Sequence, residues 1–65
     1  MFAKRIRELR KRKGLSQEKL ARLANVSFIT IVKIESGESK HPTIQTMVGI
    51  AKALGISLDK LVNQV

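Results

Sequence analysis

Apolar and polar positions along the chain follow helical spacing, and the apolar stretches begin after hydroxyl residues. Four candidate helix starts share one pattern, in which a Ser or Thr directly follows an apolar residue and lies four positions before another one. These residues are Ser16, Ser27, Thr43 and Ser57. The hydroxyl can accept a hydrogen bond from a first-turn N–H group, while the two apolar side chains pack together as a hydrophobic staple. The pattern predicts a helix start after each of these positions.

Glycine marks the expected helix ends. Gly14, Gly37 and Gly55 each follow an apolar-periodic stretch, where a residue in the left-handed conformation closes a helix. Asn25 can adopt the same conformation in a tight turn. Together the start and end signals predict five helices, at about residues 2–13, 17–24, 28–36, 44–54 and 58–63, and no strand. We therefore expect an all-α fold, a compact five-helix bundle that forms one domain over residues 1–65.

Two of these helices carry clear apolar faces. In segment 2–13, Phe2, Ile6 and Leu9 recur at offsets of four and three. In segment 44–54, one face gathers Ile44, Met47, Ile50, Ala51 and Leu54. We expect both faces to form the core. Gly49 lies opposite the second face on the helical wheel, where it should cost about 1 kcal/mol relative to Ala, and the sequence offers no reason for it.

Length and charge narrow the classes of function. With 65 residues and no Cys, the chain has room for one small core and lacks disulfides and thiolate metal sites. No apolar run approaches the roughly 18 residues that span a membrane, and Met1 and Phe2 lead directly into charged residues. The net charge is +8, and residues 4–13 hold seven basic residues and one acidic residue. Such an excess indicates an anionic partner, first of all nucleic acid, although it can also be a solvated helix face.

The second and third predicted helices are separated by only three residues, Asn25 to Ser27. So short a turn forces the helices to cross steeply, which needs small residues where the backbones approach, and Ala21 and Ala24 provide them. The pattern predicts a helix-turn-helix over residues 17–36, with the sequence QEKLARLANVSFITIVKIES.

Here the sequence resembles the Cro and lambda-repressor-like family of DNA-binding domains, often called the XRE type. The resemblance covers nearly the whole chain and includes the opening RIRELRKRKGLSQ, the IESG after the third helix, HPTIQTM and the closing IAKALGISLDKL. It implies a lambda-repressor-like fold and sequence-specific binding of double-stranded DNA, with helix 28–36 in the major groove. Family members usually carry Gly where this chain has Asn25, and polar base-reading residues where it has Phe28 and Ile29.

The third predicted helix offers a mostly apolar outer face. With Ile31 and Ile34 at its buried centre, the residues that face outward are Phe28, Ile29, Val32, Lys33 and Ser36. Apolar side chains can contact thymine methyl groups, and Lys33 can pair with guanine. The base-reading residues that we expect are Ser27, Phe28, Ile29, Val32 and Lys33. Alternatively, Phe28 and Ile29 fold back onto neighbouring helices or cover a protein interface, and Lys33 is an ordinary solvated lysine.

Other roles follow from position and from the resemblance. The residues expected to contact DNA phosphates are Arg10, Ser16, Gln17, Ser36, Ser39, Lys40 and His41. Ser16 and Gln17 begin a helix, whose N–H groups and positive dipole end suit a phosphate. Family members often pair an Arg and a Glu at the positions of Arg10 and Glu35, so the resemblance implies an ion pair between them. The alternatives are simple capping by Ser16, and ordinary surface roles for His41 and for the Arg10 and Glu35 charges.

These observations indicate a small transcriptional regulator, and a repressor more than an activator, because the chain leaves no room for a ligand-binding or activation domain. We expect it in the cytoplasm, at the nucleoid, with no membrane association and no small-molecule ligand. One His, one Asp and no Cys give no basis for a catalytic triad or a metal site, so we expect no enzyme activity, metal or cofactor. The alternative function is a protein-interaction module, of antitoxin or regulatory type, that uses the apolar face of helix 28–36.

The expected partner of the protein on DNA is a second copy of itself. One helix-turn-helix reads only a few base pairs, whereas a homodimer reads a roughly palindromic operator. Val62 and Val65 continue the apolar stripe of the fifth helix and can form the dimer contact. A frayed terminus is the alternative for these two residues.

Overall fold

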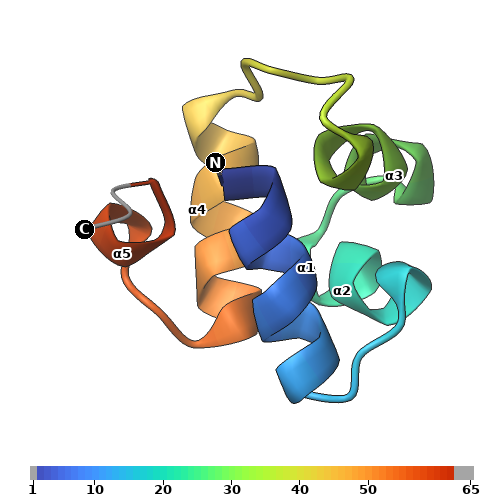
Figure 1. Cartoon of the computed structure of the whole chain (residues 1–65), viewed down its shortest axis with the longest axis vertical. Coiled ribbons are helices and arrows are strands. Elements are labelled where there is room, and N and C mark those ends of the chain that lie inside the picture. Colours follow the sequence, from blue (N-terminus) through green and yellow to red (C-terminus); the bar gives the residue numbers. More distant parts are fainter. Residues whose placement is uncertain (1, 63–65) are drawn as a thin grey trace.

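A computed structural model describes residues 2–62, which form five α-helices and no strand. The helices are α1 (Phe2–Arg12), α2 (Gln17–Ala24), α3 (Phe28–Ser36), α4 (Ile44–Leu54) and α5 (Leu58–Val62). α1 and α4 lie at the centre, with α2 and α3 on one side and α5 on the other (Figure 1). The predicted all-α fold and its helix order are confirmed. Within residues 2–62 the bounds agree with the prediction except that α1 ends one residue earlier, and the predicted end of the fifth helix at residue 63 lies outside the described residues.

All four predicted hydroxyl caps are present. Each hydroxyl accepts a hydrogen bond from the N–H group three residues further along, at 3.0 to 3.2 Å. The pairs are Ser16 with Lys19, Ser27 with Thr30, Thr43 with Thr46 and Ser57 with Lys60. Each cap satisfies one N–H group that has no partner within its helix, which is worth about 1 kcal/mol.

The turn between α2 and α3 depends on Asn25, whose φ of 60° places it in the left-handed region. Its N–H group bonds to the carbonyls of Ala21 and Arg22, so it closes α2 in the way that glycine closes α3 and α4. Asn is among the few residues with a side chain that tolerate this backbone. The exchange of the family's usual Gly for Asn25 therefore leaves the turn intact.

The core draws large aliphatic residues from all five helices. Those that are fully buried are Ile6, Leu20, Ile31, Ile34, Ile50, Leu54 and Leu61. Phe2 and Leu9 pack against this core from partly buried positions. The expectation for Ile44 is wrong, because this residue is 71% exposed. It opens α4, and the predicted face is covered only from Met47 onward, so the first turn projects past the core.

Gly49 is explained by the packing of α4 against α2. A Cβ atom on Gly49 would lie 2.5 Å from the backbone oxygen of Ala24, which is far inside van der Waals contact. The helices approach here too closely for any side chain. The helical wheel of α4 alone could not show this, because the obstacle belongs to the end of α2.

Candidate nucleic-acid interface

α3 exposes an apolar face at its N-terminal half. Ile29 is 57% exposed and Phe28 is 44% exposed, whereas Ile31 and Ile34 on the opposite side are fully buried. Val32, one turn after Phe28, is partly exposed. This division of the helix follows the predicted wheel. Phe28 and Ile29 therefore keep a large part of their apolar surface in solvent rather than in the core.

The hydroxyl groups near this face are turned toward the backbone and toward each other. Ser27 Oγ accepts from the Thr30 N–H group at 3.1 Å and lies 2.7 Å from Thr30 Oγ1. Ser36 Oγ donates to the Lys33 carbonyl at 3.0 Å and accepts from the Glu38 N–H group at 3.2 Å. Lys33 is exposed, and among residues 2–62 its ammonium group has no hydrogen-bond or ion-pair partner. The outer face thus combines apolar side chains with one available cation.

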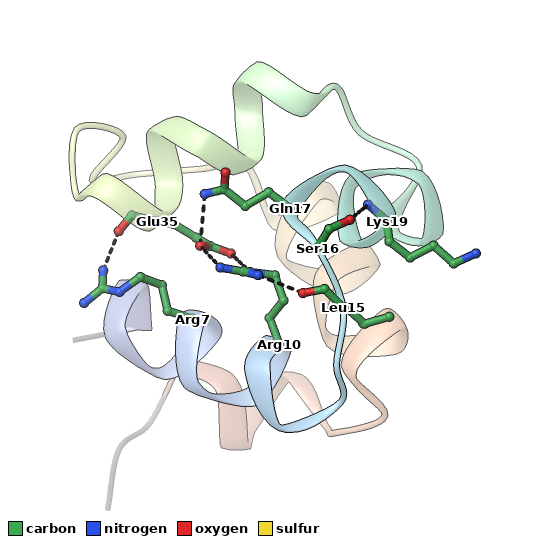
Figure 2. A network of polar contacts seen from close by, with 7 residues as sticks. All are labelled: Arg7, Arg10, Leu15, Ser16, Gln17, Lys19 and Glu35. Carbon is green, nitrogen blue, oxygen red and sulfur yellow. Dashed lines mark hydrogen bonds and ion pairs between the residues drawn. The ribbon is translucent and has the colours of Figure 1, made fainter.

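Behind this face, one buried carboxylate connects three helices (Figure 2). Glu35 of α3 is 3% exposed, and Arg10 of α1 donates to it twice, from Nε to Oε2 at 2.7 Å and from Nη2 to Oε1 at 3.0 Å. Gln17 of α2 donates from Nε2 to the same Oε1 at 3.2 Å, and Arg10 Nη1 donates to the Leu15 carbonyl at 2.7 Å. The ion pair that the resemblance implies is present in this structure. Because a bidentate bond fixes orientation as well as distance, it holds α3 at a set angle to α1 and α2.

Two further arginines of α1 bind the C-terminal ends of other helices. Arg7 donates from Nη1 to the backbone carbonyl of Glu35, in the last turn of α3. Arg5 donates from Nε to the backbone carbonyl of Lys60 in α5, at 2.9 Å. Carbonyls in a last turn lack partners within their helix and lie at the negative end of its dipole. These arginines therefore stabilise the fold, which the charge run alone could not reveal. The exposed basic residues of the same segment are Lys4, Lys11, Arg12 and Lys13.

The residues predicted to contact phosphates differ in how accessible they are. Ser16, Ser36, Lys40 and His41 are exposed, and Ser39 is partly buried. Gln17 is partly buried, and its amide nitrogen is bonded to Glu35. The side chain of Arg10 is only 12% exposed, and its guanidinium makes three hydrogen bonds inside the protein. The structure places Arg10 in the ion pair rather than on the surface, so we remove it from the phosphate-contacting set.

A second apolar surface lies where α1, α4 and α5 meet. Ile44 and Val62 are exposed by 71% and 44%, and both line a pocket to which Phe2 and Met47 also contribute. The loop before α4 completes the lining with Lys40, His41 and Pro42. α5 and α3 lie on opposite sides of α1 (Figure 1), and none of the residues that line this pocket belongs to α3, although Lys40 and His41 come from the loop that follows it. Val65, the other residue predicted for a dimer contact, lies outside the described residues.

Residues 2–62 contain no helix that is both long enough and apolar enough to cross a membrane. In the same part of the chain, no three His, Asp or Glu side chains are grouped so that they could hold a metal ion.

Comparison with solved structures gives close matches over nearly the whole chain. SinR in complex with DNA is 32% identical, with a TM-score of 0.92, and the match covers 97% of this chain and 100% of that one. The P22 c2 repressor with a synthetic operator is 29% identical, with a TM-score of 0.91 and coverages of 100% and 97%. The restriction-modification controller protein C.AhdI from Aeromonas hydrophila is 37% identical, with a TM-score of 0.87 and coverages of 92% and 89%.

A SinR/SinI complex contains a longer relative. It matches at 31% identity and a TM-score of 0.93 over 98% of this chain, which spans 62% of the length of that chain. No curated protein sequence matched. A family model described as helix-turn-helix matches residues 6–61, which is most of the chain. This protein therefore belongs to the XRE-type helix-turn-helix family, and its fold is that of the lambda-repressor-like domains.

Proposed function

We propose that this protein binds double-stranded DNA in a sequence-dependent manner, with α3 in the major groove, and that it acts as a transcriptional regulator of the repressor type. The observation that carries the proposal is the outer face of α3, which exposes Phe28, Ile29 and Lys33 on a helix that is fixed from behind by the Glu35 network. A major groove about 12 Å wide admits such a helix. Two relatives of the same fold, SinR and the P22 c2 repressor, are described in complex with DNA.

Phosphate contacts would fix the position of α3 on the duplex. The N-terminus of α2, with Ser16 and Gln17, and the loop after α3, with Ser39, Lys40 and His41, are the segments that we assign to this role. Backbone N–H groups at a helix start and a lysine in a loop are common phosphate ligands. The net charge of +8 provides long-range attraction toward the same partner.

This function needs only binding, with no catalytic group, metal or cofactor. A repressor of this type acts by occupying its site, in the cytoplasm at the nucleoid. A protein-interaction role for α3 has less support, because the relatives with solved complexes include two bound to DNA.

We further propose that two copies bind one roughly palindromic site. A two-fold pair places its recognition helices about 34 Å apart, in successive major grooves on one side of the duplex. Val62, together with Val65, is the dimer contact that we propose, and the exposed Ile44 extends the same surface. Because the patch is small, we expect pairing on DNA and a monomer when free.

Selection of bound sequences from a random duplex pool tests the DNA-binding proposal. Enrichment of one motif is the expected result, and its dyad symmetry tests the dimer separately. Lys33→Ala should change which sequences are enriched, whereas Lys40→Ala should weaken all of them about equally. If no sequence motif is enriched, and the selected pool binds no more tightly than non-specific competitor DNA, the proposal is wrong.

Lys60→Ala is the matched control. It removes the same charge from an exposed position in α5, on the opposite side of the molecule from α3 (Figure 1). We expect it to leave both the motif and the affinity nearly unchanged. A loss equal to that of Lys40→Ala would mean that net charge, not the placement of Lys40, determines binding.

A further inference from the structure

The outer face of α3 is poor in groups that can read bases by hydrogen bonding. The five outward residues include no Asn, Gln, Arg, Asp or Glu, which are the side chains that form bidentate or acceptor contacts with base edges. The hydroxyl of Ser36 is already bonded on both sides within the chain, and those of Ser27 and Thr30 are bonded to each other. Lys33 is therefore the one charged donor on this face, and the Ser27–Thr30 pair keeps a single free O–H group.

The same face is rich in exposed aliphatic surface at the end that approaches the bases. Among the large apolar side chains of α3, that of Ile29 is the most exposed, at 57%. Val32 lies one turn further along the same side and is partly exposed. The N-terminal residues of a recognition helix are those that contact base edges. The only apolar group that a standard base pair presents in the major groove is the C5-methyl group of thymine.

We propose that α3 reads pyrimidine C5-methyl groups, with Ile29 as the specificity-determining residue. This inference rests on the proposed DNA-binding function and states what the same surface recognises. A methyl group packed against Ile29 leaves water and gains contacts, whereas the bare C5–H of another pyrimidine leaves a gap there. Cytosine methylated at C5 carries the same group at the same ring position. Binding therefore responds to cytosine methylation as well as to thymine.

Replacement of thymine by deoxyuridine measures this contact directly, because it removes the methyl group and keeps every hydrogen-bonding group of the base. In the duplex enriched from the random pool, each thymine is replaced singly, and the dissociation constant is measured. At one or two positions of each half-site we expect a loss of about fourfold, which corresponds to about 0.8 kcal/mol for one buried carbon. The remaining thymines should show no change.

Ile29→Ala should abolish the difference between thymine and deoxyuridine at the sensitive position. Leu23→Ala is the matched control, because Leu23 is exposed to a similar degree, 52%, on α2. It should leave the difference unchanged. If the difference persists in Ile29→Ala, the assignment of Ile29 is wrong.

A methylated cytosine tests the same contact in a second base. The sensitive thymine–adenine pair is replaced by cytosine–guanine, with and without the C5-methyl group, and the methylated duplex should bind about fourfold more tightly. A duplex that binds well but responds neither to deoxyuridine nor to 5-methylcytosine would overturn the methyl reading and leave the DNA-binding proposal intact. A protein for which no duplex can be enriched would overturn both.

Discussion

α1 and α3 use their side chains in opposite ways. α1 is the most basic part of the chain, yet Arg5, Arg7 and Arg10 hydrogen-bond to groups inside the protein. α3 is largely apolar, yet Phe28 and Ile29 remain exposed. The charged helix thus contributes much of its charge to folding, whereas the apolar helix leaves part of its apolar surface in solvent, where we propose that DNA binds.

The difference shows that the composition of a helix does not by itself tell whether its side chains stabilise the fold or face a partner. The contacts that each side chain makes in the folded protein decide between the two. A guanidinium is useful inside a small protein because it satisfies helix-end carbonyls and a buried carboxylate at once. An apolar side chain is useful outside because a base edge presents methyl groups as well as hydrogen-bonding groups. Substitution of the hydrogen-bonded arginines of α1 should therefore lower stability, whereas substitution of the outer residues of α3 should weaken DNA binding and leave stability nearly unchanged.

The largest effect is expected at the contact between the two helices. Glu35→Ala leaves Arg10 without its partner in a nearly buried position, which should lower the free energy of unfolding by about 3 to 5 kcal/mol. Because 65 residues provide a total of only about 3 to 10 kcal/mol, much of the protein should unfold. The double change Arg10→Met with Glu35→Leu should recover most of the loss. Urea denaturation, monitored by circular dichroism, measures the free energy of unfolding of the single and the double variant. A double variant that is no more stable than Glu35→Ala would contradict the account.

A second effect is expected where packing reverses the ordinary sign of a substitution. Gly49→Ala in a helix normally gains about 1 kcal/mol, but here the new Cβ would lie 2.5 Å from the Ala24 oxygen. Overpacking of this kind costs about 1 to 3 kcal/mol, so a net loss of stability is expected. Thermal denaturation decides the sign. A variant that melts at a higher temperature than the parent would show that α2 and α4 separate easily.

A smaller effect separates the two kinds of basic residue in α1. Arg7→Ala removes a hydrogen bond to the Glu35 carbonyl and should lower the free energy of unfolding by about 1 kcal/mol. Lys11→Ala removes the same charge from an exposed site in the same helix and should change it by less than about 0.5 kcal/mol. If urea denaturation shows equal losses of stability for the two variants, then only the net charge of α1 affects stability, and the hydrogen bond of Arg7 contributes nothing.

The smallest effect on stability is expected on the outer face of α3. Ile29→Ala should change the free energy of unfolding by less than about 0.5 kcal/mol, because the side chain is largely exposed. Ile34→Ala, the same change at a fully buried site of the same helix, should cost about 2 to 5 kcal/mol. The comparison fails if the two variants are destabilised to a similar extent, since Ile29 would then be part of the core.

The sequence predicts the local parts of this structure well. Hydroxyl caps and left-handed helix ends are decided within four or five residues of chain, so Ser16, Ser27, Thr43 and Asn25 could be read directly. The division of α3 into a buried and an exposed side follows from helical period alone.

The remaining features depend on residues far apart in the chain. Gly49 is constrained by Ala24 of another helix, and Ile44 is exposed because no described element covers the first turn of α4. Arg5 and Arg7 find their acceptors 55 and 28 residues away. The Arg10–Glu35 pair could be anticipated only from the resemblance to a known family. None of these contacts can be predicted from the spacing of residues within one helix.

The salt dependence of duplex binding tests the central claim most directly. For the duplex enriched by selection, the logarithm of the binding constant should fall with the logarithm of the salt concentration, by about 0.9 for each phosphate neutralised. The account predicts a slope of several units, reduced by about one in Lys40→Ala. Ile29→Ala should keep the slope and lower the affinity at every salt concentration. A flat response to salt, or no duplex binding even at low salt, would contradict the account.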